Sequence, residues 1–312
     1  MMCWVAIVSG LTVITDYLGL TSFKSLYLDR EIVRQIGILG EPNFAAGKLA
    51  IGFPFVIWAF LEAALARRTF SAMGYATGCG LIIIAVFLTG SRMGILMVAI
   101  SLAFVAIKEW QRLLRPKIFL ISSLLAIALF LLLRGPFGTM FDLVMRRTEP
   151  LLAFIETRQE LGEPSAAMRA EMLSAGWDIF RDHPVFGVGM DGYRQVLPIY
   201  SPQLGTRYAH NTFVEILTGT GLLGFIPFTA LIISIVKRMW RGWQREGESH
   251  LPFYFALSSI MVATHLFFLS DYPNRYLWGL FLPLSLYLEW FNARRSVKER
   301  AYAGVNNTNH VE

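Results

Sequence analysis

The sequence predicts an all-α, polytopic membrane protein with about eight transmembrane helices and one long extracytoplasmic loop that contains amphipathic helices. Composition is the first observation, because only 16% of the 312 residues are charged and 55% are hydrophobic, whereas soluble domains average about 25% charged residues. The second is that the apolar residues form long blocks, and a helix needs roughly 20 apolar residues to cross a bilayer core of about 30 Å. The third is a single long connection between these blocks.

Eight apolar segments are candidate membrane spans. They lie at approximately 3–18, 44–65, 72–88, 94–107, 118–133, 212–236, 252–269 and 276–290. The expected division of the chain is therefore five transmembrane helices in 1–134, an extracytoplasmic loop in 135–210, three transmembrane helices in 211–291 and a cytoplasmic tail in 292–312.

Basic residues are concentrated in every second short loop. The rich loops hold Arg67, Arg68, Lys108, Arg112, Arg115, Lys117, Lys237, Arg238, Arg241, Arg245, Arg294, Arg295, Lys298 and Arg300. Short loops rich in Lys and Arg stay on the cytoplasmic side of a membrane, so both termini are expected in the cytoplasm. The net charge of +6 is then a topology signal and indicates no nucleic-acid partner.

The long connection from Gly135 to Ala209 is expected outside the cytoplasm, and long loops of this kind are usually functional. Its segment Ser165–Asp182 is predicted to be an amphipathic helix with Ser165 as the N-cap. Apolar residues at helical spacing would place one face on the membrane surface; they are Met168, Met172, Ile179 and Phe180. The alternative is a loop that only caps the helix bundle.

The polar tetrapeptide Thr89-Gly90-Ser91-Arg92 interrupts a long apolar run. An arginine at the bilayer centre costs at least a few kcal/mol, so the run is expected to form two helices joined by a tight outer turn. Arg92 would then lie at the N-terminus of the second helix. Free backbone N–H groups beside a guanidinium suit a phosphate group. The alternative is an interfacial arginine that snorkels to water.

Arg169 and Leu173 share one face of the predicted loop helix, which would let the leucine pack while the arginine reaches toward the membrane surface. His210 lies where the long loop re-enters the membrane. The positive end of the following helix would lower the pKa of His210, and a neutral imidazole can act as a general base. The alternative is a structural histidine that caps the helix. Gly221 and Gly224 would let another helix approach closely.

Four further polar residues are secondary site candidates. Lys48 and Glu215 carry charge within predicted spans, where ionisable groups are functional candidates by default; the alternatives are a snorkelling lysine and a glutamate paired with a loop arginine. Asn211 would orient the imidazole of His210 or a sugar hydroxyl, and Ser91 belongs to the outer turn. The spacing of these residues indicates no metal site.

Three motifs together resemble the O-antigen ligase and O-antigen polymerase family of membrane glycosyltransferases. They are Thr89-Gly90-Ser91-Arg92-x-Gly94, Arg169-x-x-x-Leu173 and His210-Asn211-x(9)-Gly221-x-x-Gly224. The third is the most specific. Pro42-Asn43 and Asp182-His-Pro-x-x-Gly187-x-Gly189 are also similar to family segments, so the resemblance covers roughly residues 42–290.

The resemblance implies transfer of a glycan from an undecaprenyl-diphosphate-linked donor, without metal or cofactor, on the outer face of a bacterial plasma membrane. It implies that Arg92 and Arg169 hold the diphosphate and that His210 activates the acceptor hydroxyl. The acceptor would be a glycan, a lipid A core or a protein, so ligase, polymerase and protein O-glycosyltransferase all remain open. Family members usually carry more spans, and the missing helices are expected at the N-terminus.

A membrane transporter or flippase-like carrier of a lipid-linked or anionic substrate is the alternative from another class. It would account for the spans and the interfacial arginines. It accounts less well for a long ordered outer loop that ends at His210, and the chain shows no internal pseudo-symmetry of the kind common in transporters. Glycan transfer that survives loss of His210 would favour the carrier.

Overall fold

The computed structural model describes residues 2–21, 27–29, 32–35, 37–39, 41–135, 137–139, 141–142, 145, 164–244 and 250–269. The helices are α1 Met2–Tyr17, α2 Pro42–Leu65, α3 Thr69–Leu88, α4 Arg92–Leu113, α5 Pro116–Arg134, α7 Pro164–Asp182, α8 Gly192–Tyr200, α9 Thr212–Gln244 and α10 Leu251–Phe268, with short 3-10 turns at Gly37–Leu39 and Pro202–Leu204. This confirms the helical fold class.

Six helices of the described residues are long and apolar enough to cross a membrane: α2, α3, α4, α5, α10 and the Thr212–Lys237 part of α9. The shorter apolar helix α1 covers the first predicted span. The eighth predicted span, 276–290, lies outside the described residues. A small antiparallel hairpin of β1 Tyr27–Asp29 and β2 Ile32–Arg34 was not predicted.

Local capping explains where the helices of the bundle begin. The Glu41 side chain accepts a hydrogen bond from the backbone N–H of Phe44 at 3.4 Å, and Pro42 occupies the first turn of α2. Pro116 begins α5 in the same way. Proline suits this position because its missing N–H would have no partner inside the helix.

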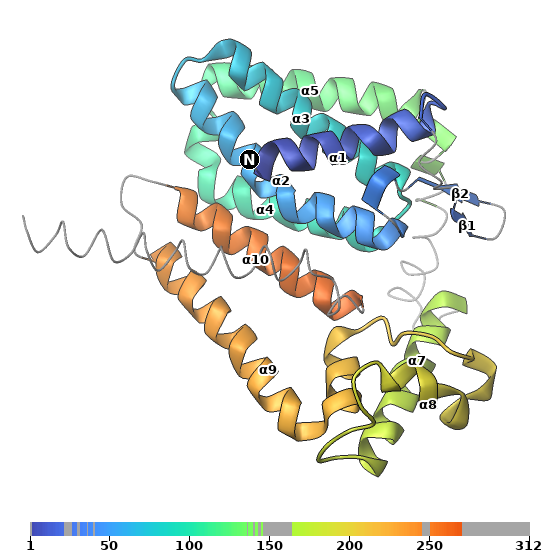
Figure 1. The fold of residues 1–312 in the computed structure, drawn as a ribbon. Helices are drawn as coiled ribbons and strands as arrows, with labels where there is room; N and C mark the ends of the chain where they lie inside the picture. The colour runs from blue at the N-terminus through green and yellow to red at the C-terminus, as the bar shows by residue number, and fades with distance from the viewer. Residues whose placement is uncertain are drawn as a thin grey trace, which may run out of the picture.

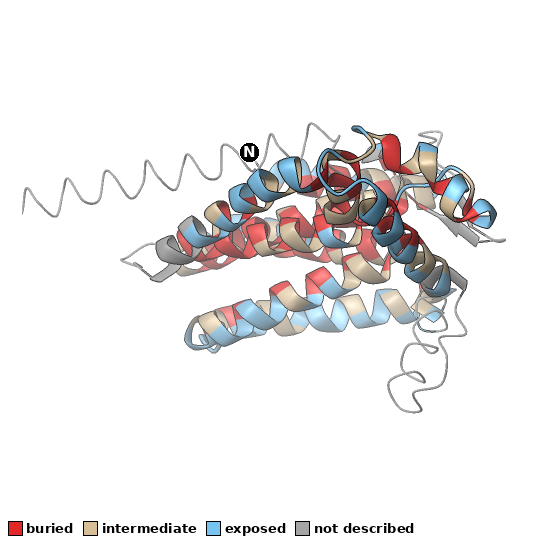
Figure 2. Ribbon diagram, turned by 90° about the horizontal axis from the view of Figure 1, so that it is seen from below, coloured by how far each residue is buried: buried red, intermediate tan, exposed pale blue. Residues whose placement is uncertain are grey.

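Helix α2 forms the centre of the bundle, and α5 lies at its edge. Phe53 and Leu61 of α2 are fully buried, whereas Phe119 and Leu131 are among the many exposed apolar side chains of α5. Figure 2 shows this contrast between buried inner helices and an exposed outer one. Helix α10 packs against α2 and α9, and α9 extends alongside α10 (Figure 1). The exposed apolar faces are those that lipid would cover.

A buried carboxylate joins α4 to the chain just before α10 at one end of the bundle. Glu109 accepts from Nδ1 of His250 at 2.7 Å and lies 3.3 Å from Nε of Arg112. Arg112 also donates to Glu62 of α2 at 3.1 Å. A buried charge is tolerated only when it is paired in this way, so the cluster ties three helices together.

Residues 164–209, between α5 and α9, form a small domain, called the loop domain, in which α7 packs against α8. Met172 and Ile179 of α7 are fully buried against Tyr193 and Leu197 of α8, and the Tyr193 hydroxyl donates to the Met172 carbonyl at 2.8 Å. The prediction that the face with Met172 and Ile179 lies on the membrane is therefore wrong, because that face forms the core of the loop domain.

The exposed apolar residues of α7 are instead Leu173 and Trp177, one turn apart on another face. Leu173 therefore does not pack inside the protein as its spacing from Arg169 suggested. The helix also begins one residue earlier than expected, at Pro164. Ser165 accordingly lies within α7 and is not its N-cap.

Candidate functional site

The turn between α3 and α4 has the predicted form. Helix α3 ends at Leu88, and the Thr89 hydroxyl donates back to the carbonyl of Val86 at 2.6 Å. Gly90 has a φ of +61°, which glycine adopts without steric cost. Ser91 then caps α4 by accepting from the N–H of Gly94 at 3.4 Å. Two helices joined by a tight turn are confirmed.

Hydrogen bonds fasten this turn to the start of α2. Ser91 donates to Oδ1 of Asn43 at 3.0 Å, and the Asn43 amide donates to Glu41 at 2.9 Å. The hydroxyl of Ser91 is therefore occupied by structural bonds on both its donor and acceptor sides. Arg92 is half-buried as the first helical residue of α4, so its backbone position is held by the cap before it.

His210 lies just outside α9 in an unusual backbone conformation. Its φ is +52°, in the left-handed region that non-glycine residues rarely adopt. Asn211 is the residue that caps the helix, because its Oδ1 accepts from the N–H of Val214 at 3.1 Å. The alternative of a capping histidine is therefore wrong. Strain of this kind persists only where neighbouring contacts hold it.

Those contacts come from Glu215 and from the end of α10. Glu215 accepts a hydrogen bond from the backbone N–H of Ala209 at 2.7 Å. Thr212 donates to the Leu269 carbonyl through its backbone N–H at 3.1 Å and through its hydroxyl at 2.6 Å. His210 is thus held on both sides by buried residues, and Glu215 supports the loop backbone.

Burial, followed by the charges of Arg169 and Arg207, lowers the pKa of His210 to about 4. The direction predicted from the sequence is confirmed, but the causes are burial and two guanidiniums, where the sequence suggested the helix dipole. Gly176 lets α7 lie directly against Val214 of α9, which brings Arg169 toward His210. Both arginines favour a neutral imidazole at pH 7.

Arg207 was missed in the sequence. It lies three residues before His210 in an irregular segment, and its Nε donates to the carbonyl of Leu204 at 2.8 Å. The sequence around a single loop arginine contains no pattern that distinguishes a functional arginine from one that is only solvated. Only its proximity to the imidazole marks it as part of the site.

Contacts through α10 connect His210 with the α3–α4 turn that precedes Arg92. The Leu269 carbonyl, bonded to Thr212, ends α10. One turn earlier the buried His265 ring lies 6.0 Å from the Phe44 ring of α2, centroid to centroid, and a side chain at Gly47 would overlap His265. Lys48 is half-buried beside that contact. The helix ends that carry Arg92 and His210 therefore share one end of the bundle.

Beyond His210, four backbone hydrogen bonds join the turn 184–189 to the stretch 218–223 of α9. We call this arrangement the clamp. Helix α9 breaks at Gly221, where φ is +59°. The carbonyls of Thr218 and Gly219 accept from the N–H groups of Val188 and Gly189 at 2.9 and 2.8 Å. The N–H groups of Leu222 and Leu223 donate to the carbonyls of Pro184 and Val185 at 2.8 and 3.2 Å.

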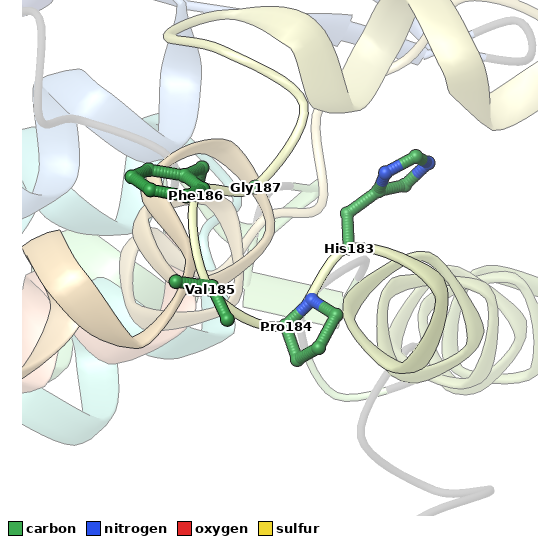
Figure 3. Close-up of a pocket in the computed structure, with 5 residues that line it drawn as sticks. All are labelled: His183, Pro184, Val185, Phe186 and Gly187. Carbon is green, nitrogen blue, oxygen red and sulfur yellow. The ribbon is translucent and has the colours of Figure 1, made fainter.

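The expectation that the glycines of α9 admit another helix is therefore wrong. A side chain at Gly187 would overlap the backbone of α9, and a side chain at Gly221 would overlap the backbone of the turn. The two glycines therefore allow the turn and α9 to lie in direct contact. The turn of residues 183–187 also borders an open hollow of about 180 Å³. His183 points away from Val185 and Phe186 there (Figure 3).

The helices that are long and apolar enough to cross a membrane define a multi-pass α-helical membrane protein. Residues 77–229 match the model of the O-antigen ligase family. This match contains all three motifs and confirms the resemblance that they predicted. No curated protein matches the chain in a sequence comparison.

Proposed function

We propose that this chain is a membrane glycosyltransferase that moves a glycan from an undecaprenyl-diphosphate-linked donor to an acceptor hydroxyl at the outer face of the bacterial plasma membrane. The observation that carries the proposal is the placement of His210, with its pKa lowered to about 4, under the influence of Arg169 and Arg207. An imidazole that is neutral at pH 7 beside guanidiniums suits a base next to an anionic leaving group.

In the proposed reaction His210 takes the proton of the acceptor hydroxyl. The acceptor oxygen forms a bond to the anomeric carbon, and the bond from that carbon to the diphosphate oxygen breaks. Arg169 and Arg92 would hold the diphosphate and offset the negative charge that develops on it. Two guanidiniums can supply this stabilisation without a metal ion, so no metal or cofactor is part of the proposal.

The secondary candidates take supporting roles in this proposal. Glu215 and Asn211 hold the segment around His210, and Ser91 holds the outer turn that presents Arg92. Lys48 lies half-buried at the same end of α2 and would add a further cation near the donor. The acceptor would be a glycan, a lipid A core or a protein.

The test uses purified full-length protein, an undecaprenyl-diphosphate-linked glycan and two acceptors, a lipid A core and a second lipid-linked glycan. We expect His210→Ala to lower turnover by about 10²–10⁴-fold, the usual contribution of a general base, with little change in donor affinity. Product length separates ligase from polymerase. Loss of donor affinity with unchanged turnover at saturation would make His210 a binding residue, and full transfer by His210→Ala would contradict its role as the base. Absence of transfer by the unmodified protein would favour a carrier.

A further inference from the structure

The turn clamped to α9 combines apolar exposure with an absence of charge. Between Asp182 and Asp191 the sequence His183-Pro-Val-Phe-Gly-Val-Gly-Met190 carries no acidic residue, lysine or arginine. Phe186 at this turn is 75% exposed. Val185 and Met190 are 52% and 61% exposed as well, and contiguous exposed apolar residues mark surfaces that contact a membrane or a partner.

The clamp places this turn against a membrane span. Its hydrogen-bond partners, Thr218 to Leu223, belong to the part of α9 that is long and apolar enough to cross the membrane. On the same stretch Leu223 is 64% exposed, and Leu222 and Ile226 are exposed as well. The exposed apolar side chains of the turn therefore lie beside the exposed apolar side chains of a membrane span.

Non-helical backbone is tolerated at membrane depth only when its polar groups are satisfied within the protein. The clamp supplies such partners to several backbone groups of the turn and of α9. The N–H groups of Val188 and Gly189 are bonded to α9, and so are the carbonyls of Pro184 and Val185. The N–H of Gly187 is bonded within the turn, to the carbonyl of His183 at 3.1 Å.

We propose that the turn Pro184–Gly189 is a re-entrant wedge that inserts into the outer leaflet, with Phe186 in contact with lipid acyl chains. The side chains divide as insertion requires, because His183 points away from Val185 and Phe186 (Figure 3). Three contacts then hold the loop domain in place. They are the hydrogen bonds of the clamp, the packing of α7 against α9 and the insertion of the turn into the bilayer. The wedge would hold the domain at a set depth beside the lipid-facing side of α9.

Site-directed fluorescence tests this placement and needs no donor or acceptor. A cysteine-free background, Cys3→Ser with Cys79→Ala, receives single cysteines for a bimane label in vesicles of phosphatidylcholine with nitroxide-bearing acyl chains. The test position is Phe186→Cys. The matched control is Gln195→Cys, exposed on α8 of the same domain, and Leu223→Cys reports the span.

We expect the label at position 186 to be quenched by the nitroxide lipid several-fold more than the label at 195, and protected from aqueous iodide. Quenching at 223 without quenching at 186 would overturn the proposal, because the span would be in lipid and the turn in water. Efficient crosslinking of two 186 cysteines by a bismaleimide, without lipid quenching, would instead assign the surface to a second copy of the chain. Because Phe186 is largely exposed, its replacement removes little packing.

Discussion

Glu215 and Ala209 are joined across the candidate base, since the glutamate carboxylate accepts from the Ala209 backbone N–H at 2.7 Å. Both residues are buried, and the only residue between Ala209 and the cap Asn211 is His210. The bond therefore fixes the chain immediately before His210, whose backbone is in the left-handed region.

Replacement of Glu215 tests whether this bond positions the base. Glu215→Ala leaves a buried N–H without its acceptor, so we expect a loss of about 1–3 kcal/mol in stability. Turnover should fall by about 10²-fold, the scale of a 1 Å misplacement in an active site. Glu215→Gln keeps a carbonyl acceptor and should retain most turnover. Equal losses in both variants would indicate that the negative charge matters, and the assay is glycan transfer at saturating donor.

The pH dependence of transfer follows from the lowered pKa of His210. A general base works when neutral, so kcat/KM should stay level as pH falls from 7 to 5 and be halved near the pKa of about 4. Arg207→Gln removes a charge that disfavours the imidazolium, so the pKa should rise and the half-point move to higher pH. Arg194→Gln is the control, because Arg194 is not among the causes of the shift.

The profile is measured by brief jumps from pH 7 into each buffer, with residual activity checked after return to pH 7. This separates titration from unfolding. An unchanged half-point in Arg207→Gln, or a half-point near 6.5 in the unmodified protein, would contradict the electrostatic account of the site.

Arginine-to-lysine variants test recognition of the diphosphate. Lysine keeps the charge but lacks the planar bidentate fork, and hydrogen bonds to charged groups contribute about 1.5–3 kcal/mol. We therefore expect Arg92→Lys and Arg169→Lys each to lower kcat/KM by about 10- to 100-fold. Arg181→Lys, on the exposed part of α7, is the matched control. Wild-type kinetics in both test variants would place phosphate recognition elsewhere.

Topology can be tested with two exposed glutamines on opposite sides of the predicted membrane. Gln195 lies on α8 and Gln111 near the end of α4. In the cysteine-free background, we expect Gln195→Cys to react with an impermeant maleimide applied to intact spheroplasts and Gln111→Cys to react only after lysis. The reverse pattern would invert the orientation deduced from the basic loops.

Glycine substitutions test the clamp. Gly187→Ala and Gly221→Ala add both the strain of a positive φ and a clash with partner backbone. Gly205→Ala adds the strain of a positive φ, of order 1–3 kcal/mol, in open space. We expect both clamp variants to unfold at a lower temperature than Gly205→Ala in detergent. Similar thermal midpoints for all three would show that the close approach contributes nothing to stability.

The sequence by itself determined the features that depend on length and on local chemistry. Apolar length gave the membrane spans, because hydrocarbon thickness sets a minimum helix length. The turn between α3 and α4 was predicted correctly, since Gly90 supplies the required backbone and Ser91 the cap. The motif around His210 marked the point where the long loop leads into α9.

Only the tertiary structure decided which surfaces meet. Helical spacing showed that Met172 and Ile179 share a face, but a face of that kind suits lipid and protein equally, and here it meets α8. The sequence likewise did not specify that Gly221 contacts a loop rather than a helix. Nor did it specify that the charge of Arg207, in an irregular segment, acts on His210. Periodicity specifies what a face is made of, while its partner depends on contacts between residues far apart in the chain.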